Sequence, residues 1–115
     1  MPLQCVIIDD YEPFLEAARA SLERQGMVVV GVATNGTEAL RLARELGPDV
    51  ALVDISLGTE SGFQVGRQIR PYVGSVILIS SDETGDYAEL LAASPAVGFL
   101  PKAELSASAI QQLVA

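Results

Sequence analysis

Carboxylates, hydroxyls and one amine stand at the ends of the most apolar segments of this chain. Four short apolar runs each stop at side chains suited to chemistry, namely Asp9 and Asp10, Asp54, Ser80 and Ser81, and Lys102. Histidine is absent, which removes the commonest general base and the commonest nitrogen ligand for metals. Any chemistry in this chain therefore depends on carboxylates, hydroxyls and the lysine amine.

Asp9 and Asp10 are adjacent, and the neighbouring sequence holds no Lys, Arg or His to neutralise them. Carboxylates about 4.5 Å apart repel by roughly 3 to 4 kcal/mol at an effective dielectric constant near 20. A cluster that also includes Asp54 is costly unless it holds a hard divalent cation, and carboxylates with a backbone carbonyl and waters suit Mg²⁺. We therefore expect Mg²⁺ here, with one of the adjacent carboxylates ligating the metal and the other orienting a coordinated water.

Each of these side chains also has a purely structural interpretation. Asp10 could cap the first helix, Asp54 could form an Asx turn, Ser80 could bond a loop amide, and Lys102 could be a solvated charge. For any one residue the structural interpretation is the simpler one. For all of these residues together the structural interpretation is weaker, because it has to hold independently in four separated segments.

The elements that position these residues follow from the periodicity, in which short β-branched runs alternate with stretches of helical spacing. The predicted strands are 3–8, 27–33, 50–54, 75–80 and 96–100, and the predicted helices are 12–25, 37–46, 61–70, 84–93 and 104–114. Pro13 suits the first turn of a helix, and Gly26 and Gly47 lie just past helix ends.

Strands that are apolar on both faces are typical of a parallel sheet covered by helices on both sides. The pattern predicts an α/β fold, a doubly wound five-stranded parallel sheet formed by a single domain over 1–115. In such sheets ligands bind outside the carboxyl ends of the strands. The polar residues that end the strands should therefore gather at one rim.

Composition narrows the function further. The chain has 115 residues, 50% of them hydrophobic, which suits one compact domain. Its formal charge of -8 and pI near 4.3 argue against direct binding to nucleic acid or to a membrane surface. A lone Cys5 cannot form an intramolecular disulfide, and neither a leader nor a membrane-length apolar stretch precedes the domain, so we expect the cytoplasm.

Four segments, in order and spacing, resemble the receiver domain of bacterial two-component response regulators, most closely the receivers that precede helix-turn-helix output domains. The segments are IIDD (7–10), LVDISLGTESG (52–62), ILISS (77–81) and GFLPK (98–102). The resemblance spans essentially the whole chain and implies a flavodoxin-like sheet of strand order 2-1-3-4-5.

The resemblance also implies a role for each strand-end residue. Asp54 would be the phosphoacceptor, with Ser80 and Lys102 as its catalytic partners on the phosphoryl oxygens. The remaining implied sets are Mg²⁺ ligands at Asp9, Asp10, Asp54 and the Ser56 carbonyl; phosphate contacts at Ser56, Ser80, Ser81 and Lys102; and a switch pair, Ser80 and Phe99. Because Phe99 lacks the hydroxyl that many relatives carry there, we expect it to favour the inward position without phosphate.

The implied activity is that of a switch rather than a turnover enzyme. The domain would take a phosphoryl group from a histidine kinase or phosphotransfer protein, catalyse the transfer itself and later hydrolyse the acyl phosphate. Phosphorylation would change the surface formed by the segments 84–93, 96–100 and 104–114. We also expect that a homodimer could form through this surface. Asp82, two residues after Ser80, would lie near the hydrolytic water and either orient it or repel the phosphoryl group.

Three other functions fit less well. A flavodoxin-type nucleotide binder needs a hydroxyl- and Gly-rich loop where this chain has DDYEPF (9–14). A phosphatase of the haloacid dehalogenase type needs a second Asp two residues after Asp54, where Ser56 stands. A receiver-like module that binds partners without phosphorylation remains the main alternative.

Overall fold

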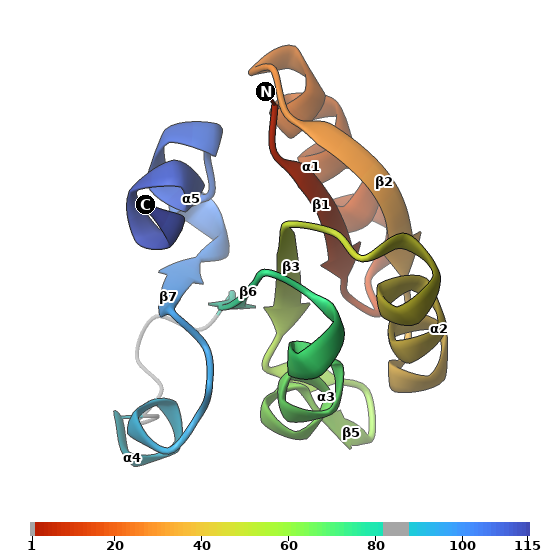
Figure 1. Ribbon diagram of the computed structural model, residues 1–115, viewed down its shortest axis with the longest axis vertical. Helices are drawn as coiled ribbons and strands as arrows, with labels where there is room; N and C mark the ends of the chain where they lie inside the picture. Colours follow the sequence, from red (N-terminus) through yellow and green to blue (C-terminus); the bar gives the residue numbers. More distant parts are fainter. Residues whose placement is uncertain (1, 82–87) are drawn as a thin grey trace.

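The computed structural model describes residues 2–81 and 88–115, and its helices and strands alternate along the chain (Figure 1). The strands are β1 (Gln4–Ile8), β2 (Val28–Ala33), β3 (Val50–Asp54), β4 (Ser56–Leu57), β5 (Glu60–Ser61), β6 (Ser75–Ser80) and β7 (Gly98–Pro101). The helices are α1 (Glu12–Arg24), α2 (Gly36–Leu46), α3 (Gly62–Ile69), α4 (Ala88–Ala92) and α5 (Ala107–Val114), with 3-10 turns η1 (Arg70–Tyr72) and η2 (Lys102–Glu104).

Five of the strands form one parallel sheet in the order β2-β1-β3-β6-β7. Counting only these five in chain order gives 2-1-3-4-5, so the predicted sheet is confirmed. β3 lies at the centre, with β1 and β6 as its neighbours. Strand order therefore reverses between β1 and β3, and the carboxyl ends of these two strands carry Asp9 and Asp54.

Alternate residues of each strand enter two separate cores, one on each face of the sheet. In β3, Val50 and Leu52 pack with α1 and α5, whereas Ala51 and Val53 pack with α2 and α3. All four are fully buried. A buried Val or Leu side chain contributes about 1.5 to 3 kcal/mol relative to exposure. Burial on both faces fixes the register, because a one-residue slip would exchange the two cores.

The helix boundaries agree with the sequence signals except near the C-terminus. Pro13 lies in the first turn of α1, and Gly26 and Gly47 adopt positive φ angles of 94° and 51° just after α1 and α2. The predicted helix over 104–114 begins later, at Ala107. Ser106 is its N-cap, and its hydroxyl accepts a hydrogen bond from Ala109 N at 3.0 Å.

Two further differences concern the loops. An antiparallel hairpin, β4 and β5, follows β3 directly and was not predicted from the sequence, because strands of two residues carry no detectable periodicity. Gly58 turns this hairpin with a φ angle of 62°, which favours glycine. The predicted helix over 84–93 corresponds to α4, and its first four positions lie outside the described residues.

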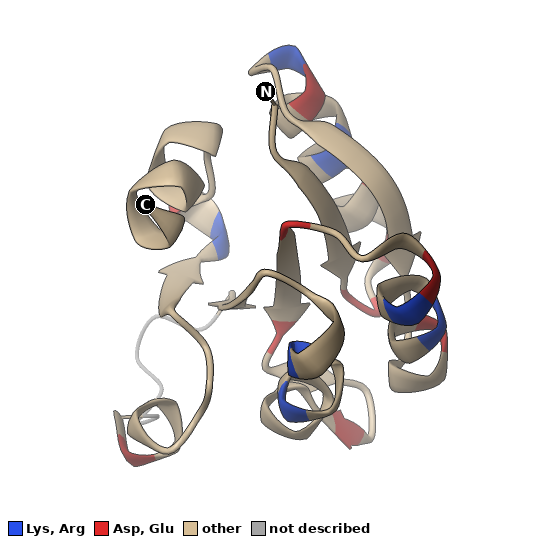
Figure 2. Ribbon diagram, viewed as in Figure 1, with Lys and Arg blue, Asp and Glu red and all other residues tan. Residues whose placement is uncertain are grey.

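Charge is distributed unevenly over the elements (Figure 2). All six arginines lie on α1, α2, α3 and η1, and the single lysine lies at the start of η2, while α5 carries no charged side chain. None of the helices in the described part of the chain is both long enough and apolar enough to span a bilayer.

The thiol of Cys5, in β1, is predicted to be unreactive in the native protein. Burial raises its pKa from 9.0 to about 11, and the charge of Glu23 adds to the shift. Two pKa units reduce the thiolate fraction about 100-fold, so iodoacetamide at pH 8 should alkylate native protein at least about 100-fold more slowly than urea-unfolded protein. Because the folded pKa is the higher one, this contribution to stability is complete below pH 9 and is lost as the pH rises towards 11. Equal alkylation rates in the two states would contradict this burial.

Candidate functional site

A pocket of about 580 Å³ lies at the carboxyl ends of the sheet strands. It is lined by Asp9, Asp10, Tyr11, Phe14, Asp54, Ser56, Gly58, Ser81 and Lys102. These residues lie at or just after the ends of β1, β3, β6 and β7, in the hairpin of β4 and β5, and at the N-cap and in the first turn of α1. The predicted rim of strand-end residues therefore forms one continuous surface.

Lys102 is the centre of this pocket. Its Nζ lies 2.5 Å from Oδ2 of Asp9 and 3.1 Å from Oδ2 of Asp54. Its side chain is only 15% exposed, and both carboxylates are less exposed still. The ammonium thus joins the last strand of the sheet to the first and third, and it is the only lysine in the chain.

Asp54 is held by two donors. Its Oδ1 accepts a hydrogen bond from Ser56 N at 3.1 Å, and its Oδ2 accepts one from the Lys102 ammonium. Burial raises the pKa of Asp54, and the nearby charge of Asp9 raises it further, while the Ser56 amide and Lys102 act in the opposite direction. The pKa of Lys102 is also raised: burial lowers it, but Asp9 and Asp54 outweigh burial.

The acidic side chains fit a divalent metal ion. Asp9, Asp10 and Asp54 each offer a carboxylate oxygen, and the three oxygens lie within 4.8 Å of one another. Oδ1 of Asp9 accepts a hydrogen bond from Tyr11 N at 2.9 Å, while its buried Oδ2 has Lys102 as an ion-pair partner but no hydrogen bond of good geometry among the described residues. Three carboxylates and one ammonium leave two uncompensated negative charges, which a dication would neutralise.

The structural interpretations of these residues can now be compared with the contacts. Asp10 does not cap α1, whose N-cap is Tyr11, and Lys102 is not a solvated charge. Asp54 does form the Asx-type contact with the amide two residues on, in addition to its ion pair. The Asx-type contact and a chemical role are compatible for Asp54, because the Ser56 amide binds Oδ1 and leaves Oδ2 directed at the Lys102 ammonium.

The two predicted switch residues, Ser80 and Phe99, are not among the residues that line the pocket. Ser80 is buried at the end of β6, whereas the neighbouring Ser81 is exposed and lines the pocket. Phe99 in β7 is half-buried and packs against the core on the α2 and α3 face. Asp82 lies outside the described residues. The roles assigned to these four residues stay predictions.

Phe14 belongs to the pocket although the sequence analysis did not single it out. Nζ of Lys102 lies 4.4 Å from the centroid of the Phe14 ring. The available signal was its place in the first turn of the helix that follows Asp9 and Asp10. In the sequence alone, an aromatic residue there reads as part of the core.

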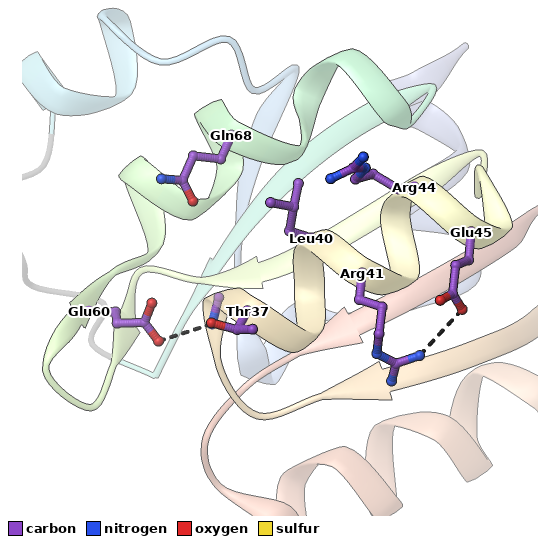
Figure 3. Close-up of a pocket in the computed structure, with 8 residues that line it drawn as sticks. Thr37, Leu40, Arg41, Arg44, Glu45, Glu60 and Gln68 are labelled. Atoms are coloured by element: carbon purple, nitrogen blue, oxygen red, sulfur yellow. Dashed lines mark hydrogen bonds and ion pairs between the residues drawn. The ribbon is translucent and has the colours of Figure 1, made fainter.

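A side chain of the hairpin contacts the start of α2. Oε1 of Glu60 in β5 accepts a hydrogen bond from Gly36 N at 2.9 Å, which ties the hairpin to the start of α2 (Figure 3). The pocket drawn there, of about 660 Å³, is larger than the acidic one. Its charged lining includes an ion pair of 3.3 Å between Arg41 and Glu45, and it lacks a carboxylate held against an ammonium. The smaller pocket is therefore the better candidate for chemistry.

Gly62 is a point of very close approach between α3 and β3. A Cβ atom on Gly62 would lie 1.9 Å from the backbone oxygen of Asp54. Gly62 N also donates a hydrogen bond to Ile55 O at 2.9 Å. The absence of a side chain at Gly62 thus allows α3 to start directly beneath Asp54.

The fold and this pocket together define a class of α/β domain with an acidic site at the topological switch point of a parallel sheet. The model of the response regulator receiver domain family matches residues 5–115. EvgA, a DNA-binding transcriptional activator of Escherichia coli K12, is 28% identical over 104 residues, covering 89% of this chain and 51% of EvgA. The transcriptional regulatory protein YvfU of Bacillus subtilis is 31% identical over 103 residues, covering 87% and 52%.

Solved structures give the same result. A two-component response regulator of the LuxR family from Aurantimonas sp. SI85-9A1 superposes with a TM-score of 0.87, with 27% identity over 99% of this chain and 86% of that one. The chain therefore belongs to the receiver-domain family of response regulators. It spans about half the length of the curated relatives it matches.

Replacing Gly62 by Ala tests the close approach at Asp54. The new methyl group cannot fit against the Asp54 carbonyl, so α3 has to shift, and we expect a loss of about 2 to 3 kcal/mol in the free energy of unfolding by urea. Gly66→Ala in the same helix is the matched control. Its Cβ would lie 3.3 Å from a side-chain methyl of Val76 and not against the backbone, so a change within about 1 kcal/mol is expected. Equal stability of the two variants would contradict the tight packing.

Proposed function

We propose that residues 1–115 form one receiver domain that accepts a phosphoryl group on Asp54 in a Mg²⁺-dependent reaction. The single observation that supports this most directly is the Lys102 ammonium held between Asp9 and Asp54 at the strand ends. Receiver domains of response regulators are signalling switches rather than classical enzymes, and the chain is a family member. The donor is a histidine kinase or a phosphotransfer protein.

The pocket residues divide into a metal side and a phosphoryl side. Asp9, Asp10 and Asp54, with the backbone carbonyl of Ser56, would hold the ion. Lys102 would bind the phosphoryl oxygens from the opposite side, together with Ser80 and with polar groups of Ser56 and Ser81. Bound Mg²⁺ supplies charge neutralisation between the carboxylates and an anionic phosphoryl group.

In the transfer, a carboxylate oxygen of Asp54 forms a bond to phosphorus as the bond from phosphorus to the donor's histidine nitrogen breaks. That nitrogen keeps the electron pair and takes a proton. Lys102 moves from Oδ2 of Asp54 onto a phosphoryl oxygen, where its charge offsets the transferred anion. In the later hydrolysis, water attacks phosphorus, and Asp54 returns to the carboxylate with release of inorganic phosphate.

The output of the switch would pass through Ser80 and Phe99. Ser80 is buried next to the pocket, and Leu78, two residues earlier in β6, is paired in register with Phe99 in β7. A phosphoryl group that draws the Ser80 hydroxyl towards it would free space for the half-buried Phe99 ring to turn inward. The surface of α4, β7 and α5 would then change, and homodimerisation through it is part of the proposal.

Further partners are proposed from the relatives, whose printed names describe transcriptional regulators. An output domain that binds DNA would act beside this domain, which itself carries a charge of -8. Cys5 is a free thiol, which suits a reducing compartment, and we propose the cytoplasm as the place of action. The alternative is a module that binds partners without phosphorylation. The mass measurement below distinguishes this alternative from the proposed phosphoacceptor domain.

Incubation with Mg²⁺ and acetyl phosphate should raise the intact mass by one phosphoryl group, and Asp54→Asn should abolish the gain because the amide is not a competent nucleophile. Asp49→Asn is the matched control. Asp49 lies just before β3, at its amino end, and its Oδ2 accepts a hydrogen bond from Gln4 N that an amide oxygen also accepts. If Asp54→Asn gains the same mass as the wild type, the phosphoacceptor is another residue. If the wild type gains no mass, the alternative of a module that binds partners without phosphorylation is favoured.

Replacing Lys102 by Met should strengthen Mg²⁺ binding while slowing phosphorylation. The ammonium competes with the metal for Oδ2 of both Asp9 and Asp54, so its removal should raise the affinity about tenfold at pH 8, as measured by calorimetry. Lys102→Arg keeps the positive charge and should change the affinity much less. Weaker Mg²⁺ binding in Lys102→Met would show that the ion and the ammonium do not share these carboxylates.

A further inference from the structure

The ring of Phe14 occupies a place that the phosphoryl-transfer proposal leaves unexplained. It lines the acidic pocket and also a second, smaller pocket of about 180 Å³ between α1 and the segment leading to α5. Lys102 lines both pockets as well. The ring is thus part of the partition between two spaces, and the lysine side chain borders on each of them.

Three neighbours fix the Lys102 ammonium in the acidic pocket. Two are the carboxylates of Asp9 and Asp54, and the third is the Phe14 ring, whose centroid lies 4.4 Å from Nζ. An ammonium this close to the face of an aromatic ring is attracted by the ring's negative quadrupole, the more strongly where water is excluded. At 15% exposure the Lys102 side chain meets that condition.

The ring differs from the carboxylates because it takes no part in metal binding or in phosphoryl transfer. When a dication binds, the charges on the carboxylates are shared with it, and their hold on the ammonium weakens until a phosphoryl oxygen arrives. A lysine has four flexible side-chain torsions and loses about 2 kcal/mol of rotamer entropy when it is fixed. A constant partner is then needed to keep the amine at the reaction centre rather than in the second pocket.

We propose that Phe14 is a positioning residue for phosphoryl transfer, which holds the Lys102 ammonium over the phosphoacceptor through a cation–π contact. The inference rests on the proposed phosphorylation of Asp54. Phe14 is half-buried, so its replacement disturbs the core only in part. Its effect is exerted through Lys102, because no reacting atom has to touch the ring.

Kinetics of phosphorylation by acetyl phosphate at saturating Mg²⁺ tests the contact. Phe14→Leu removes the ring and should lower the rate roughly 3- to 30-fold, the range that such contacts span in energy. Phe14→Tyr keeps the aromatic face and should restore the rate to within about twofold of the wild type. Fluorinated phenylalanines placed at position 14 weaken the quadrupole at nearly constant shape, and the rate should fall step by step with each added fluorine.

A matched control is offered by the other cation–π pair of the described residues. The guanidinium of Arg44 lies 5.7 Å from the centroid of the exposed Tyr72 ring, and neither residue is among those that line the acidic pocket. Tyr72→Leu makes a similar aromatic-to-aliphatic change and should leave the phosphorylation rate unchanged. Urea unfolding of Phe14→Leu verifies that the variant is folded under the assay conditions.

The single lysine supplies a direct spectroscopic readout. In protein labelled with ¹³C-lysine, the one ε-methylene signal belongs to Lys102, and the ring should shift its protons upfield in the wild type but not in Phe14→Leu. An upfield shift should persist after phosphorylation, because the amine turns onto a phosphoryl oxygen while remaining beside the ring.

Each outcome of these experiments is decisive. A graded loss with fluorination and an upfield lysine signal support the contact. A wild-type rate in Phe14→Leu overturns the proposed contact. A slow rate in Phe14→Leu that does not change with fluorination of the ring also overturns it, because the ring would then act only through its bulk. If the wild type itself gains no phosphoryl group on Asp54, the proposed function fails, and this inference fails with it.

Discussion

The ion pairs of Lys102 with Asp9 and Asp54 are the interaction on which the rest of this structure depends. They connect the end of the edge strand β7 to the ends of β1 and β3 at the centre of the sheet. Without the ammonium, buried carboxylates would face one another uncompensated, and breaking a buried pair of this kind costs about 3 to 5 kcal/mol. The same pairs occupy Oδ2 of Asp54, which in the proposed reaction would exchange the ammonium for a metal ion or a phosphoryl group. In the proposed function, stability and reactivity would therefore reside in the same three side chains.

The backbone around this cluster is shaped to leave it room. The hairpin β4–β5 begins two residues after Asp54, and a hydrogen bond of Glu60 ties it to the start of α2. Gly58 turns the hairpin through a positive φ, and Gly62 lets α3 begin beneath the Asp54 carbonyl. The residues that make these contacts would not bind a phosphoryl group themselves. They orient the backbone of Ser56, whose N–H donates a hydrogen bond to Asp54. The site is thus built as much from backbone constraint as from charge.

The sequence predicts the sheet well because β3 and β6 are apolar on both faces and end at charged or hydroxyl residues, a pattern that few other folds require. It also predicts the gathering of Asp9, Asp54 and Lys102, since parallel strands bring their carboxyl ends to one edge. The hairpin and the partition formed by Phe14 were not predictable, because two-residue strands have no period and an aromatic residue on α1 looks like core. The start of α5 was misjudged because the 3-10 turn η2 follows Lys102 before Ser106 caps the helix.

A crystal structure of the domain with Mg²⁺ and beryllofluoride, which mimics a phosphoryl group on a carboxylate, tests the central claim most directly. The account predicts a fluoride-bearing group on Asp54, one metal ion among the oxygens of Asp9, Asp10 and the Ser56 carbonyl, and Lys102 turned from Asp54 onto a fluorine atom. A mimic attached to another carboxylate, or an ion bound outside the acidic pocket with Lys102 still on Asp9 and Asp54, would contradict it.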